Sequence, residues 1–254
     1  MIKRITTIAE LINLRRKHSS ENKKVGFVPT MGALHEGHIS LFKKSVAEND
    51  LTIASIYVNK TQFNDPTDYN NYPRDIEKDI ELLENAGVDV SFLPTYEEIY
   101  ADNYNYRIVE NSLSKVLCGK SRKGHFEGVL TVVLKLLNLV QPAKAYFGEK
   151  DYQQYSLIKK MCEAFFINTE IISCPTVREI DGLAMSSRNL LLTNQERIMA
   201  ANFYRLLKQE KDIYKVKVEL EKLGFGVDYI EDIDQRRFGA VFLGKVRLID
   251  NVEL

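Results

Sequence analysis

The chain has 254 residues, 44% hydrophobic and 28% charged, and its 35 Lys and Arg residues match its 35 Asp and Glu residues. This length can form one large domain or a large domain and a small one. The zero net charge gives no reason to expect nucleic acid or an anionic membrane as a partner. Because the N-terminus lacks a signal-peptide core and no segment could span a bilayer, we expect a cytoplasmic protein. Its Cys118, Cys162 and Cys174 are expected to be reduced thiols.

The first elements are a helix, two strands and the helix between them. Thr7 opens a capping box, which predicts a helix over residues 8–17. The apolar run 25–28 predicts a buried strand, which Pro29 should end because proline cannot donate to a sheet ladder. After a second helix, the nearly unbroken apolar run 51–58 predicts a central parallel strand, and the polar loop behind it lies where open α/β sheets bind ligands.

Strands and helices keep alternating as far as Pro175. Expected helices cover 75–86, 96–100, 129–140 and 152–166, and expected strands cover 88–93, 143–147 and 169–174. The basic, glycine-rich loop 118–128 fits a functional loop and a flexible surface turn equally well. The alternation predicts an α/β fold, a doubly wound parallel sheet over residues 1–175.

Beyond Pro175 the pattern changes, which predicts a small C-terminal α+β domain over residues 176–254. Thr193 begins another capping box and therefore a helix. Residues 240–249 are expected to form a strand.

The segment 29–38 joins a strand to a helix and is the strongest functional candidate. A helix beginning near Gly37 directs backbone N–H groups and its positive dipole end toward an anion. His35 and His38 would project beside that end and could donate to phosphate oxygens, while Gly32 and Gly37 leave room for a ligand. A zinc site and a loop held only by ordinary capping are the alternatives, and the first lacks a spaced third and fourth ligand.

The chain resembles the pantothenate synthetase (pantoate–β-alanine ligase) family of the nucleotidylyl transferase superfamily, whose sheet is Rossmann-like and whose signature is a His-x-Gly-His element. The resemblance rests on motifs spread over nearly the whole chain, namely 29–38, 62–63, 72–74, 124–129, 147–151, 185–189 and 247–251. A His-x-Gly-His element alone would be weak, but these motifs in this order are highly specific.

The resemblance implies a two-step reaction: ATP and pantoate give pantoyl adenylate and pyrophosphate, and β-alanine then attacks the acyl carbon to give pantothenate and AMP. It implies catalytic roles for His35, His38, Lys150 and Arg188. The ATP site would comprise Pro29, Thr30, Met31, Gly37, His38, Phe147, Gly148, Lys150, Asp151, Val177, Met185, Ser186, Ser187 and Arg188.

Pantoate would be bound by Met31, Gln62 and Gln154, and β-alanine by Gln62. Neutral amide side chains suit this task because they can orient a carboxylate nucleophile without neutralising it. Mg²⁺ would accompany ATP with no dedicated protein metal site. The resemblance also implies a homodimer. Individual roles have simpler alternatives, since Asp151 could cap a helix and Met31 could fill the core.

Some positions depart from the family pattern. Lys60 and Lys123 stand where prolines are usual, so the loop that carries Gln62 could be looser or could gain a charge near the substrate carboxylate. The region 210–240 is short for the family, which leaves the size of the closing domain open. Another nucleotidylyl transferase would not explain Gln62 together with Gln154. A non-catalytic nucleotide-binding regulator would not need Lys150 and Arg188.

Overall fold

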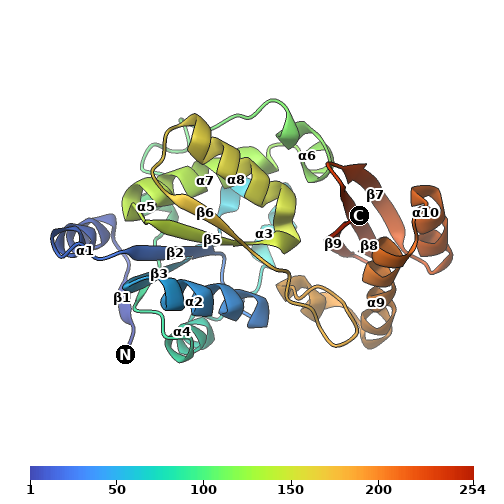
Figure 1. Ribbon diagram of the computed structural model, residues 1–254, viewed down its shortest axis with the longest axis horizontal. Helices are drawn as coiled ribbons and strands as arrows, with labels where there is room; N and C mark the ends of the chain where they lie inside the picture. Colours follow the sequence, from blue (N-terminus) through green and yellow to red (C-terminus); the bar gives the residue numbers. More distant parts are fainter.

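The computed structural model describes residues 1–254 and contains a six-stranded parallel sheet and a separate three-stranded antiparallel sheet (Figure 1). The large sheet has the strand order β1-β4-β3-β2-β5-β6. Its strands are β1 Lys3–Ile5, β2 Val25–Thr30, β3 Leu51–Ile56, β4 Val90–Phe92, β5 Lys144–Gly148 and β6 Glu170–Cys174. The chain proceeds from β2 outward through β3 to β4 and then returns to place β5 on the other side of β2. The strand order therefore reverses between β2 and β5.

Helices cover both faces of this sheet, which confirms the doubly wound prediction. The helices are α1 Ile8–Ser20, α7 His125–Val140 and α8 Tyr152–Ala164 on one face, and α2 Glu36–Glu48 and α4 Ile76–Asn85 on the other. Successive strand residues point to opposite faces of the sheet. Phe27 packs in the core beneath α1, α7 and α8, and Val28 packs in the core beneath α2 and α4. This alternation is the two-residue period of a strand buried on both faces.

Short elements occupy the loops at the edges of the sheet. They are α3 Pro66–Asn70, α5 Tyr96–Ile99 and α6 Cys118–Ser121, with 3₁₀ turns at Lys60–Gln62, Leu113–Lys115, Glu149–Asp151 and Ser187–Leu191. The capping boxes expected at Thr7 and Thr193 are both present. None of the helices is long and apolar enough to cross a membrane.

The prediction that Pro29 ends its strand is wrong. β2 continues through Pro29 to Thr30, paired with Ser55 and Ile56 of β3. On its other side, the pairing of β2 with β5 stops at Phe27. Because the ladder with β5 has already ended, the missing N–H of proline interrupts no sheet hydrogen bond.

The C-terminal part builds its own layer and core. Strands β7 Gly226–Ile233, β8 Arg236–Leu243 and β9 Val246–Glu253 pack against helices α9 Asn194–Gln209 and α10 Ile213–Lys222. We propose a domain boundary near residue 175, just beyond the end of β6 and before the first residue of this core, Leu183. The single strand expected over 240–249 is instead a hairpin that turns at Gly244, whose φ of +57° favours glycine.

Candidate active site

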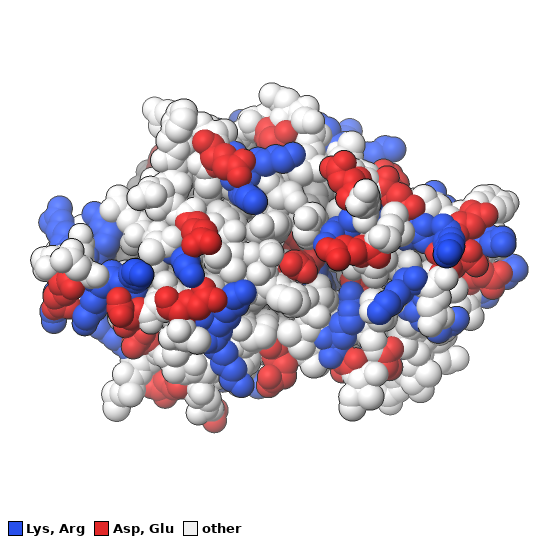
Figure 2. Space-filling model, in the orientation of Figure 1, with Lys and Arg blue, Asp and Glu red and all other residues white.

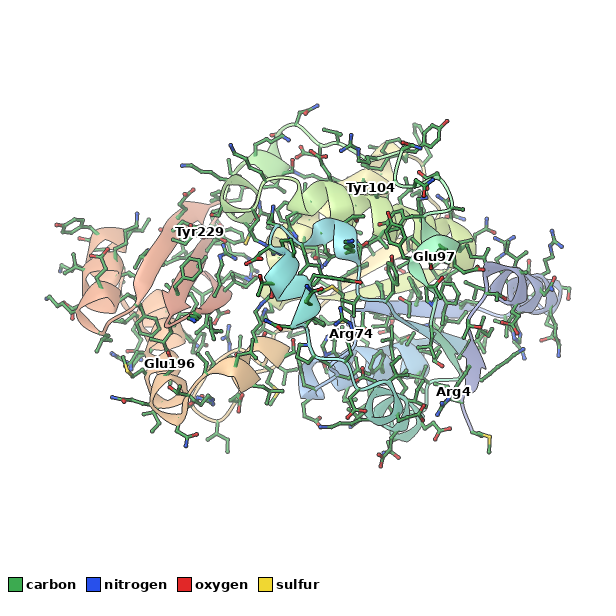
Figure 3. All side chains as sticks on the ribbon, turned by 180° about the vertical axis from the view of Figure 1, so that it is seen from behind. Arg4, Arg74, Glu97, Tyr104, Glu196 and Tyr229 are labelled. Atoms are coloured by element: carbon green, nitrogen blue, oxygen red, sulfur yellow. The ribbon has the colours of Figure 1, made fainter.

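A cavity lies at the carboxyl ends of β2, β3 and β5, between the large sheet and the segment that leads to the C-terminal domain. It sits at the reversal of strand order between β2 and β5, the usual ligand position in open α/β sheets. All residues that the sequence analysis assigned to ATP, pantoate or β-alanine line this one cavity, including the late segment Met185, Ser186, Ser187 and Arg188. Over the face shown in Figure 2, positive and negative side chains are interspersed without a continuous basic surface.

The two histidines at the start of α2 are neutral hydrogen-bond donors. The Gly37 N–H donates to Nδ1 of His35 over 3.1 Å, and the His35 N–H donates to Nδ1 of His38 over 3.3 Å. Since both Nδ1 atoms accept, each neutral ring carries its proton on Nε2. Burial, reinforced by the charge of Lys150, lowers the pKa of His35 to about 4. Burial, with His35 and Lys150 adding to it, lowers the pKa of His38 to about 3.

The loop before these histidines is fixed by Asp79, a residue that the sequence analysis missed. Its buried carboxylate, from α4, accepts the backbone N–H groups of Ala33 and Leu34 over 2.9 and 2.8 Å. Burial raises the pKa of this carboxyl. Gly32 has a φ of +79°, and a Cβ there would lie 2.7 Å from the carboxylate, so only glycine fits. A carboxylate next to Ile80 and one helical turn before Leu83, the buried apolar residues of α4, was the available signal.

Lys150 and Asp151 enter the cavity from a turn directly after β5. The Lys150 Nζ lies 3.5 Å from the Asp151 carboxylate. Burial would raise the pKa of Asp151, but the charges of Lys150 and Arg188 outweigh it, and the pKa lies below its ordinary value. Asp151 is the only acidic residue in the cavity wall. It has no capping bond to α8, so the helix-capping alternative finds no support.

The opposite wall comes from the segment between the two domains. Ser186 is the N-cap of a 3₁₀ turn and accepts the Arg188 N–H over 3.3 Å. The Arg188 guanidinium donates to Asp68 of α3 over 2.8 Å, so it is held at the rim by a carboxylate. This contact joins the late segment to the first domain.

The amide of Gln62 is oriented by its neighbours. Asn59 donates to Oε1 of Gln62 over 3.0 Å, and Nε2 of Gln62 points at Sδ of Met31 over 3.1 Å. The amide N–H groups are therefore the part of Gln62 directed into the cavity. The Lys60 side chain is exposed and is not part of the cavity lining.

The basic loop 118–128 contributes to the cavity, which decides against a simple surface turn. Arg122 and His125 both line it, and His125 Nδ1 lies 2.8 Å from the carbonyl oxygen of Gln62. Burial, reinforced by Arg188, lowers the pKa of Arg122 to about 10, so it remains a cation at neutral pH. The motif Gly124-His125-Phe126 was the available signal. Lys123 is exposed, and its carbonyl accepts from Asn64.

The sequence and the fold are similar to those of known proteins over nearly the whole chain. The family model for pantoate–β-alanine ligase matches residues 3–253. The chain belongs to the pantoate–β-alanine ligase family. This ligase joins pantoate to β-alanine in an ATP-dependent reaction, and the assignment favours that activity over another nucleotidylyl transferase or a regulator.

Known relatives are similar to this chain over nearly its full length. Pantothenate synthetase of Legionella pneumophila is 52% identical over 236 residues, which are 93% of this chain and 94% of the relative. A crystal structure of the Francisella tularensis ligase, complexed with β-γ ATP and β-alanine, is 45% identical. It superposes with a TM-score of 0.94 over 100% of this chain and 98% of the other. Pantothenate synthetase from Thermus thermophilus is 38% identical, with a TM-score of 0.90 over 99% of each chain.

Proposed function

We propose that this cavity performs both steps of the ligase reaction, with pantoyl adenylate as the intermediate. In the first step a pantoate carboxylate oxygen attacks the α-phosphorus of ATP, and the bond to the bridging oxygen of pyrophosphate breaks. In the second step the amine of β-alanine attacks the acyl carbon, and the acyl C–O bond breaks to release AMP. The convergence of the phosphate motif, Lys150, the late segment and both glutamines in one cavity carries this proposal.

In the first step, His35 and His38 would each donate an Nε2 hydrogen to phosphate oxygens. Because both rings are neutral and partly buried, their donors are fixed before the charge develops, and fixed donors are the most effective way to stabilise a transition state. Lys150 and Arg188 would supply positive charge on either side of the phosphates, and the hydroxyls of Ser186 and Ser187 would donate to them. Gly37 leaves a backbone surface close to Met185, where the nucleotide would lie.

Pantoate would occupy the deep, partly apolar end of the cavity. Val129, Val132, Val133 and Leu136 of α7 form an apolar wall suited to its two methyl groups. The Gln62 amide N–H groups, aimed into the cavity beside Met31, would orient its polar groups together with Gln154. An amide leaves the attacking carboxylate its charge, which a lysine at this place would neutralise.

In the second step, β-alanine would bind beside Gln62 once pyrophosphate has left. No His, Asp or Glu of the cavity wall is placed as a dedicated base for its ammonium group. The only carboxylate is Asp151, paired with Lys150, and both histidines of the phosphate motif have Nδ1 occupied. His125 is engaged at both nitrogens, because Nδ1 donates to the Gln62 carbonyl and Nε2 accepts from Arg122. We infer that the amine attacks in its minor neutral form. Closure of the late segment over the cavity would keep water from the adenylate. An Arg188→Ala variant that forms adenylate at the normal rate would contradict that role for the segment.

Mg²⁺ is proposed as a companion of ATP. No group of three or more His, Cys, Asp or Glu side chains is arranged to hold an ion, and Mg²⁺ bound mainly through phosphate oxygens needs few protein ligands. Bound in this way, the ion would reduce the repulsion among the phosphates. Asp151 is the one carboxylate in the cavity wall that could contact the ion, or alternatively the ribose. We further propose a cytoplasmic homodimer, on family resemblance alone.

The direct test supplies ATP, Mg²⁺, pantoate and β-alanine and measures AMP and pantothenate. We expect equal amounts of the two products, with neither accumulating over many turnovers when β-alanine is omitted. Absence of pantoate-dependent AMP formation would overturn the proposal.

A further inference from the structure

The turn that carries Lys150 is held by the C-terminal domain. Asn251, on β9, donates its two side-chain N–H groups to the carbonyl oxygens of Glu149 and Lys150, over 2.8 and 3.0 Å. β9 is the strand of the small sheet nearest the first domain (Figure 1). Asn251 is 4% exposed, so both bonds are shielded from water. A residue about one hundred positions later in the chain therefore fixes the backbone of the cationic turn.

No side chain of the turn caps it. The 3₁₀ turn Glu149–Asp151 and the helix α8 that follows it both lack a side-chain capping bond at their first residue. A capping side chain would accept backbone N–H groups, whereas Asn251 donates to two backbone carbonyl oxygens, so its contact is of a different kind. The two amide N–H groups of Asn251 are therefore side-chain donors from the other domain that restrain the backbone of this turn.

The Asn251 amide is itself fixed in orientation. Its Oδ1 accepts from Nη1 of Arg236 over 2.6 Å, and the Arg236 guanidinium lies 3.9 Å from the centre of the Tyr152 ring on α8. With the oxygen occupied by a cation, the two N–H groups must face the carbonyls. Only an amide satisfies all three contacts, because aspartate would place an oxygen against two carbonyl oxygens.

The neighbouring residue makes a parallel contact to the opposite wall of the cavity. Asp250 accepts two hydrogen bonds from Arg178, over 2.6 and 3.0 Å, and Arg178 pairs with Ala184 in the hairpin that leads to Met185. Successive residues of a strand point to opposite faces, so Asp250 and Asn251 reach in two directions. One dipeptide of β9 therefore contacts both segments that bring cations to the phosphates.

We propose that Asn251 is a positioning residue for adenylate formation, acting through the Lys150 turn. The proposal rests on the phosphate-binding role of Lys150 proposed above. Misplacing a reacting group by about 1 Å can cost on the order of 100-fold in rate. We therefore expect Asn251→Asp to slow pantoate-dependent ATP–pyrophosphate exchange roughly 10- to 100-fold. Asn251→Ala, which removes the donors without adding repulsion, should lose less.

The effect should be confined to the first step. When prepared pantoyl adenylate and β-alanine are supplied directly, Asn251→Asp should form pantothenate within about twofold of the wild-type rate, because the pyrophosphate whose charge Lys150 is proposed to offset is absent from this step. The KM for pantoate should also change little. A merely structural role would slow both steps together.

A matched control exists in the same domain. On α9, Asn202 donates to the carbonyl of Met199 and accepts from Arg205, which reproduces the chemistry of Asn251 far from the cavity. Asn202→Asp should leave both steps unchanged. Melting temperatures of both variants show whether each folds, and Asn251→Ala serves if the aspartate variant does not.

A double-mutant cycle decides whether Asn251 acts through Lys150. In a Lys150→Ala background, Asn251→Asp should change the exchange rate less than about twofold, since coupled residues are non-additive. Multiplicative losses, an equal loss in both steps, or exchange as fast as in Asn202→Asp would each overturn the proposal. If the proposed function itself is wrong, the wild-type protein shows no pantoate-dependent exchange, or Lys150→Ala does not slow it. These two controls therefore distinguish that failure from a failure of the Asn251 proposal.

Discussion

The two functions of the His38 ring can be separated by substitution. Nδ1 accepts the His35 N–H within the capping arrangement of α2, and Nε2–H is the proposed phosphate donor. Asparagine can place an oxygen near the Nδ1 position but has nothing at Nε2. Glutamine can place an N–H near Nε2 but loses the acceptor at Nδ1. The two substitutions, His38→Asn and His38→Gln, therefore test the phosphate donor and the helix cap independently.

We expect His38→Asn to fold normally and to lose about 10²–10³ in kcat, the loss measured when one fixed transition-state donor is removed, equivalent to about 2.7–4 kcal/mol. His38→Gln should retain more activity and be destabilised by roughly 1 kcal/mol through the lost cap. Steady-state kinetics and urea unfolding measure the two quantities. Near-normal kcat in His38→Asn, or greater loss in His38→Gln, would refute the assigned tautomer.

Three further predictions follow from the geometry. The pKa values of His35 and His38 are about 4 and 3 in the folded protein but near 6.5 in the unfolded chain, which therefore binds more protons between these values. The free energy of unfolding should fall as the pH drops below about 6.5. Equal free energies from urea unfolding at pH 5 and pH 7.5 would contradict this. Gly128→Ala puts a Cβ 2.5 Å from the Thr61 carbonyl oxygen, which should lower the free energy of unfolding by about 1–3 kcal/mol and raise the pantoate KM. An unchanged melting temperature would contradict this prediction. Gln62→Glu places a carboxylate beside that of pantoate, so it should raise the pantoate KM at least about tenfold and leave the ATP KM unchanged. Equal changes in both KM values would argue against a pantoate-binding role for Gln62.

Local signals in the sequence were enough to predict most of the fold. The capping boxes at Thr7 and Thr193 involve residues three apart, and the buried strand over 51–56 is a mostly apolar run. Such patterns need no knowledge of distant partners. The strand through Pro29 was misjudged because the cost of a proline depends on whether a neighbouring strand is paired there.

The candidate site was predicted as a set of motifs, and the structure shows why they belong together. What the sequence could not reveal are the groups that hold them: Asp79 lies 45 residues from the Leu34 it fixes, and Asn251 lies 101 residues from Lys150. These contacts follow from the tertiary arrangement alone. Asn251 belongs to the motif 247–251, but the sequence does not reveal which residues its side chain contacts.

The central claim is that the cavity activates pantoate as an adenylate before β-alanine takes part. Exchange of labelled pyrophosphate into ATP, measured with Mg²⁺ and no β-alanine, tests it most directly. We predict exchange that requires pantoate and that falls at least about 100-fold in His38→Asn. Exchange without pantoate, or none until β-alanine is added, would contradict the account.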